Sequence, residues 1–126
     1  MHRPNLRQSF RHAWNGLVYT VRTQRNARIH LGVGLTVAAL AVWLRLDAVR
    51  CALLALTIGA VIVGETINTA LEALVDLLSP EYHEQAKVAK DVAAGAVLVL
   101  GLTAIAVGLL ILGPPLWRFA FPASAN

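Results

Sequence analysis

A run of acidic and amide side chains lies between residues 64 and 79, in the segment GETINTALEALVDLLS. In a helix each residue turns by about 100°, so side chains three, four and seven positions apart share a face. The polar residues that fall within one sector of about 100° are Glu65, Asn68, Thr69, Glu72, Asp76 and Ser79. Three like charges on one face repel one another. We therefore expect a cation to meet them, whether a metal ion, a basic side chain or a proton.

Basic side chains follow this segment at the start of the next apolar run. Lys87 and Lys90 lie there, together with Asp91. A lysine carries a compact charge on a flexible stem, which suits contact with a phosphate group. The alternative is structural: the lysine extends its charge to the membrane interface, and the aspartate occupies the first turn of a helix.

The composition requires that these residues act at a membrane. Of the 126 residues, 57% are hydrophobic and only 14% are charged, whereas about 25% of residues are charged in soluble domains. This balance excludes a soluble multidomain enzyme. The single cysteine, Cys51, has no partner in the chain, which excludes a disulfide scaffold.

The apolar residues are arranged in runs long enough to cross a bilayer, which takes about 20 residues of helix. We predict an all-α integral membrane protein with transmembrane helices over residues 29–49, 50–79 and 90–113. An amphipathic surface helix over residues 4–27 precedes them, and residues 114–126 form a tail. The whole chain is one domain.

The charges before the first span predict the orientation. Six arginines precede that span, and no acidic residue occurs before Asp47. Because basic residues near membrane helices stay on the cytoplasmic side, the N-terminus is expected to be cytoplasmic. The protein itself is expected to lie in the inner membrane. Arginines in this position reach anionic headgroups. Binding of nucleic acid, the other use of a basic stretch, does not fit arginines that lie directly before a span.

The depth of the acidic face separates two classes of function. If the second span starts at Cys51, Glu65 lies about 7.5 Å inside the inner boundary, and Glu72 and Asp76 lie about 10 and 16 Å further along, in or near water. A reaction between an aqueous donor and a lipid headgroup needs such an arrangement. The alternative is a small oligomeric membrane carrier in which Glu65 binds a proton or cation, and it would keep its carboxylate nearer the midplane.

Two stretches of the sequence resemble the prokaryotic diacylglycerol kinase and undecaprenol kinase family. They are ETINTALEALVD at residues 65–76, followed by EYH at 81–83, and AKDVAAGA at 89–96. The segment RNARIH at 25–30 is similar to the one before the first span in the undecaprenol kinase branch. The resemblance covers nearly the whole chain.

The resemblance implies a homotrimer that transfers the γ-phosphate of ATP, with Mg²⁺, to the hydroxyl of a lipid alcohol at the cytoplasmic face. By matching position, Glu65 is the base that accepts the proton of the lipid hydroxyl, and Asn68 orients the reactants. Glu72 is the magnesium ligand. The positions implied to contact the nucleotide are Asp76, Lys90 and Asp91.

One position departs from the family pattern. Gln24 stands where the family generally has a second metal-binding glutamate. An amide oxygen can ligate Mg²⁺, which prefers oxygen ligands, but it brings no charge. Gln24 is therefore expected to be a weaker second ligand. The acceptor implied is either diacylglycerol or undecaprenol, and the RNARIH segment favours undecaprenol.

Overall fold

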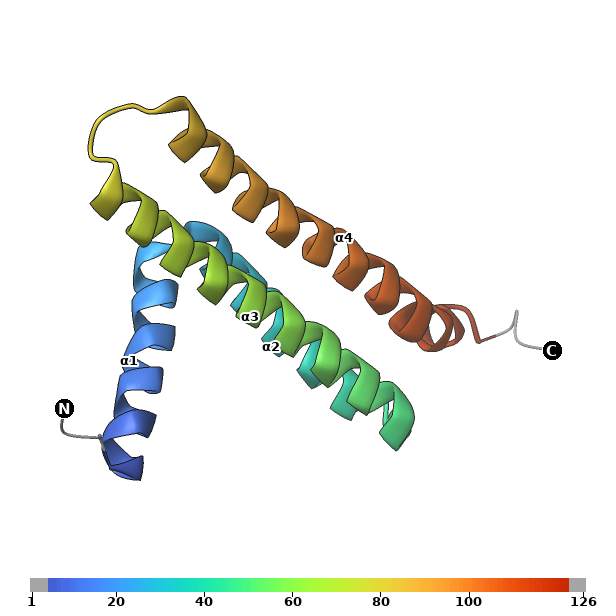
Figure 1. Ribbon diagram of the computed structural model, residues 1–126. Coiled ribbons are helices and arrows are strands. Elements are labelled where there is room, and N and C mark those ends of the chain that lie inside the picture. The colour runs from blue at the N-terminus through green and yellow to red at the C-terminus, as the bar shows by residue number, and fades with distance from the viewer. Residues whose placement is uncertain (1–4, 123–126) are drawn as a thin grey trace.

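The computed structural model describes residues 5–122. Within that range the chain forms four helices: α1 (Leu6–Thr23), α2 (Arg25–Trp43), α3 (Ala48–Leu78) and α4 (Glu84–Ala120). Figure 1 shows α2, α3 and α4 running along one direction, while α1 projects from them at a steep angle. The prediction of an all-helical chain is confirmed for the described residues.

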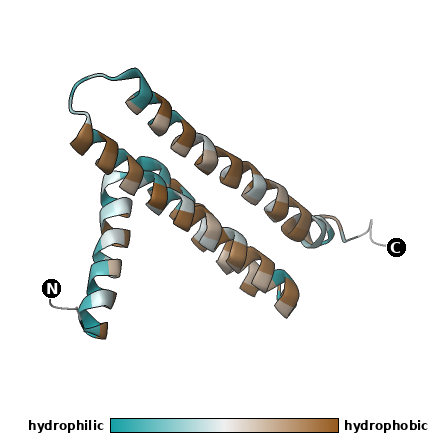
Figure 2. Cartoon of the chain, in the orientation of Figure 1, coloured by the Kyte–Doolittle hydropathy of each residue, from teal (hydrophilic) through white to brown (hydrophobic). Residues whose placement is uncertain are grey.

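Helices α2, α3 and α4 are each long and apolar enough to cross a membrane, as the prediction of three spans requires. Figure 2 shows their largely hydrophobic surfaces and the hydrophilic connection between α3 and α4. With 31 and 37 residues, α3 and α4 are about 46 and 55 Å long. Both are longer than the roughly 30 Å of hydrocarbon, so part of each helix extends beyond it.

The boundaries of the helices differ from the predicted ones for local reasons. The predicted surface helix covered residues 4–27. Its start at residue 4 lies outside the described residues, and α1 ends at Thr23, before the predicted end. Gln24 is extended (φ −100°, ψ 121°) and separates α1 from α2. The predicted first span was also too long, because Arg45 takes a left-handed conformation (φ 52°) and Asp47 caps a new helix. The chain turns there instead of continuing to residue 49.

The N-cap of α3 is stabilised by its own charges. The Asp47 side chain accepts a hydrogen bond from the backbone N–H of Arg50 at 3.0 Å, and its other oxygen lies 3.3 Å from Arg50 Nε. The backbone hydrogen bond holds the pKa of Asp47 below its ordinary value.

Helix α4 continues beyond its predicted end at residue 113. Pro114 and Pro115 lie inside the helix, which runs to Ala120, so the first residues of the predicted tail are helical. Prolines have no N–H to donate, but helices in membranes tolerate them where neighbouring groups satisfy the freed carbonyls. The remainder of the tail, residues 123–126, lies outside the described residues.

Small residues set the close approaches between the helices. Gly34 of α2 lies against Ile58 of α3, and a Cβ at Gly64 of α3 would collide with the Leu100 side chain of α4. The buried cluster of Ala41, Leu54 and Leu112 joins the same three helices near the α2–α3 turn. These contacts fix the rotation of α3, and with it the direction in which its polar face points.

Candidate functional site

The polar face of α3 points into the protein at its middle and reaches solvent toward its end. Glu65 is only 2% exposed, and Asn68 and Thr69 are also buried. Glu72 is half-buried, and the Asp76 side chain is 65% exposed. The face therefore joins a carboxylate buried within the protein to an accessible one along a single helix.

Gln24 and Asn68 hold the Glu72 carboxylate from two sides. Gln24 Nε2 donates to Glu72 Oε2 at 2.8 Å, and Asn68 Nδ2 donates to Glu72 Oε1 at 2.9 Å. The extended backbone at Gln24 turns this residue toward α3, although 48 positions separate it from Glu72. Two residues assigned as metal ligands thus lie together, with the residue assigned to orient the reactants beside them.

This cluster fits a magnesium ion by the chemistry of its donors. Its atoms include two carboxylate oxygens and two amide oxygens, and the buried Asn68 Oδ1 has no hydrogen-bond partner among the described residues. Mg²⁺ prefers oxygen ligands and is usually bound by one or two carboxylates together with substrate phosphates. No group of three or more His, Cys, Asp or Glu side chains gathers in residues 5–122.

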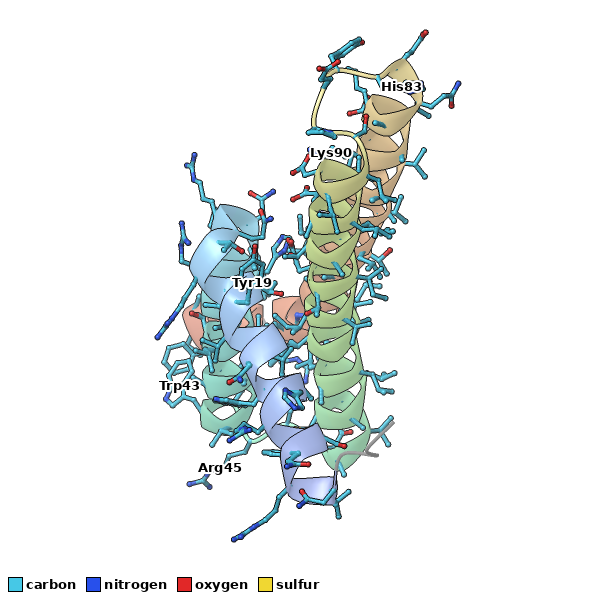
Figure 3. The ribbon with its side chains drawn as sticks, turned by 60° about the vertical axis from the view of Figure 1, so that its left-hand side comes forward. Tyr19, Trp43, Arg45, His83 and Lys90 are labelled. Carbon is cyan, nitrogen blue, oxygen red and sulfur yellow. The ribbon has the colours of Figure 1, made fainter. Side chains whose placement is uncertain are left out.

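The basic residues of α4 meet the exposed end of the polar face. Lys90 Nζ donates to Asp76 Oδ1 at 2.5 Å, and Lys87 pairs with Asp91 at 2.5 Å one turn away. Figure 3 shows Lys90 near the connection that carries His83, at the end opposite Trp43 and Arg45. Exposed ion pairs of this kind contribute little to stability, because water screens their charges.

An apolar groove of about 350 Å³ leads to Glu65. It lies between α1, α2 and α3, and its lining includes Trp14, Leu17, Leu31, Ile62 and Glu65. A second cavity, of about 410 Å³, is lined by Trp43, Arg50 and Arg118, and no residue of the polar face borders it. The groove at Glu65 is therefore the one of these two cavities that combines an apolar lining with a carboxylate of the polar face.

His30 is the site residue that the sequence reasoning missed. Its Nδ1 lies 2.7 Å from Glu65 Oε1. The usable signal was helical spacing, because His30 lies three residues after Ala27 and four before Gly34, on the buried face of α2.

Comparisons with known proteins agree with this geometry. Residues 11–112 match the family model described as prokaryotic diacylglycerol kinase. The chain belongs to this family. It is 52% identical over 114 residues to a diacylglycerol kinase from Synechocystis sp., a match that covers 90% of this chain and 65% of that protein. The chain thus spans slightly less than two thirds of that relative.

Two further relatives match over most of their own length. An undecaprenol kinase from Bacillus subtilis is 38% identical over 86% of this chain and 89% of its own. A diacylglycerol kinase from Escherichia coli K12 is 32% identical over 80% of this chain and 83% of its own. The prokaryotic diacylglycerol kinase family therefore includes relatives named for either lipid alcohol, and the resemblance noted in the sequence is confirmed.

Proposed function

We propose that the chain is a lipid kinase that transfers the γ-phosphate of Mg-ATP to the hydroxyl of a membrane lipid alcohol. The observation that carries this proposal is the arrangement of α3. Glu65 lies buried at an apolar groove, Glu72 lies in an oxygen-rich cluster about 10 Å along the same face, and Asp76 meets Lys90 at the exposed end. Family membership supports the same activity.

The chemistry follows from these positions. Phosphoryl transfer needs the acceptor oxygen in line with the γ-phosphate and the phosphate charge neutralised. In the proposed reaction the lipid O–H bond breaks and its proton passes to the Glu65 carboxylate, while the lipid oxygen bonds to the γ-phosphorus. The bond from phosphorus to the β–γ bridging oxygen breaks, and ADP leaves with its electron pair.

The other site residues hold and orient the reactants. Glu72, assisted by Gln24, would hold Mg²⁺, which when bound offsets negative charge on the phosphates. Lys90 and Asp76 would contact the nucleotide, with Asp91 beside them on α4. Asn68 donates to Glu72 and so fixes the carboxylate between the two substrates. The groove that Glu65 borders is lined mostly by apolar side chains.

The proposal includes the membrane setting and the assembly. Leu6, Phe10 and Trp14 on α1 are 88, 74 and 58% exposed, which suits a surface helix whose apolar side chains enter the inner leaflet. The protein would lie in the inner membrane with a cytoplasmic N-terminus. Large exposed apolar surfaces on α2, α3 and α4 suit contact with lipid and with two further copies in a homotrimer.

The acceptor lipid is the finer part of the proposal. Relatives are named for diacylglycerol and for undecaprenol, so either alcohol is a candidate. The RNARIH segment contains His30, which contacts Glu65 beside the groove. We favour undecaprenol as the acceptor because this segment is similar to that of the undecaprenol kinase branch.

A panel assay tests the function directly. Purified protein in detergent is incubated with labelled ATP and Mg²⁺, and diacylglycerol, undecaprenol and a soluble alcohol such as glycerol are compared side by side. Label is expected in the lipid product, and conversion of ATP to ADP should depend on added lipid alcohol. A carrier, the alternative use of Glu65, would move protons or cations without nucleotide, and no labelled lipid with any alcohol would contradict the kinase.

The hydrogen bond between Gln24 and Glu72 leads to a prediction about magnesium. Gln24→Glu replaces the N–H donor with a second carboxylate at hydrogen-bond distance from Glu72. The two charges repel unless a cation lies between them, so the Mg²⁺ concentration for half-maximal activity should fall several-fold, about tenfold at most. The measurement is a Mg²⁺ titration of lipid phosphorylation at fixed ATP.

Gln8→Glu is the matched control for this titration. It adds the same charge on α1, where a glutamate can preserve the capping box with Asn5. This variant should titrate like the wild type. An unchanged titration in Gln24→Glu would show that position 24 is not a magnesium ligand.

A further inference from the structure

The buried carboxylate of Glu65 is anchored by a histidine from another helix. His30 Nδ1 of α2 lies 2.7 Å from Glu65 Oε1. Both atoms are buried, and neither makes a hydrogen bond in residues 5–122, so this close contact is what joins them. A buried carboxylate without a donor is costly, so the imidazole is the polar group that supports Glu65 in its place.

The imidazole is itself fixed by the packing of three helices. Its Nε2 edge faces Gly101 of α4, where a Cβ would lie 3.8 Å away in ordinary van der Waals contact. Its Nδ1 edge faces α3, and its backbone belongs to the buried face of α2 that carries Ala27 and Gly34. The side chain is 28% exposed. Residues of α2, α3 and α4 therefore surround the imidazole.

The groove leaves few other groups that could take this role. Arg22 of α1 is the other charged side chain that lines it, and no titratable side chain from α4 lines it in the described part of the chain. The hydroxyl of Thr69, one turn along the same helix, donates to the backbone carbonyl of Glu65 and not to its carboxylate.

We propose that His30 is the positioning residue for the general base. In this role Nδ1–H would donate to the Glu65 oxygen that it contacts, and so direct the other oxygen to the lipid hydroxyl in the groove. This inference rests on the proposed lipid kinase activity. It assigns the positioning of the Glu65 carboxylate to a residue of α2, outside the acidic face of α3. A positioning partner of this kind typically changes the rate by about 10- to 100-fold.

The test compares side chains that place a donor at different points. Asparagine carries its amide nitrogen where Nδ1 lies, whereas glutamine carries it where Nε2 lies. We expect His30→Ala and His30→Gln to lower kcat about 10- to 100-fold with less than threefold change in the KM for lipid, and His30→Asn to recover most of the rate. His12→Asn, at an exposed position on α1, is the control and should match the wild type.

A double variant separates positioning from folding. Because His30 acts through Glu65, His30→Ala combined with Glu65→Gln should be no slower than Glu65→Gln alone, whereas a structural role would add a second loss. Wild-type kcat in His30→Ala, equal rates for His30→Asn and His30→Gln, or additive losses would overturn the proposal. Failure of the kinase assignment would instead be seen in the wild type, as absence of labelled lipid.

Discussion

Glu65→Gln is expected to lower kcat for lipid phosphorylation by about 10²- to 10⁴-fold, the contribution typical of a general base. Glutamine has nearly the shape of glutamate but cannot accept the proton of the lipid hydroxyl. Because Glu65 is 2% exposed at the edge of the groove, no water can readily take its place. The loss corresponds to about 3–5 kcal/mol of transition-state stabilisation.

The measurement separates this loss from a loss of binding or of fold. The KM for ATP should stay near the wild-type value, because the nucleotide groups lie about 10–16 Å further along α3. Thermal unfolding in detergent should also change little, since the variant keeps the volume of the side chain. Glu81→Gln makes the same chemical change at an exposed position of the α3–α4 connection and should remain active. Wild-type kcat in Glu65→Gln would refute its role as the base.

Glu72→Gln is expected to weaken the use of magnesium. The substitution removes the only carboxylate of the cluster formed with Gln24 and Asn68. Gln24 and Asn68 each donate a hydrogen bond to one oxygen of Glu72. A glutamine at position 72 has only one side-chain oxygen, so its NH₂ group would face one of these donors and that hydrogen bond would be lost. The expected loss in kcat/KM for Mg-ATP is about 10²-fold or more, equal to about 3 kcal/mol.

A Mg²⁺ titration distinguishes this variant from Glu65→Gln. Raising the Mg²⁺ concentration should restore part of the activity of Glu72→Gln, because the lost charge weakens cation binding. The same titration should leave Glu65→Gln inactive, because a base that cannot accept a proton is not replaced by a cation. Full activity of Glu72→Gln at low Mg²⁺, with Glu81→Gln as the reference, would remove Glu72 from the proposed site.

The spacing of residues along the sequence predicted the features that lie within one helix. Hydropathy runs predicted three spans because a bilayer admits only helices whose backbone groups are satisfied internally. The period of 3.6 residues placed Glu65, Asn68 and Glu72 on one face. These features need no knowledge of neighbouring helices, since they depend on the geometry of a single chain segment.

The tertiary structure decided which residues from different helices meet. The break at Gln24 directs its amide to Glu72, and the buried face of α2 brings His30 to Glu65. Lys90 turned out to pair with Asp76, while Asp91 pairs with Lys87 on its own helix. Such contacts depend on where a helix ends and how it is rotated against its neighbour. Those properties are set by glycine contacts and packing that periodicity along one segment does not encode.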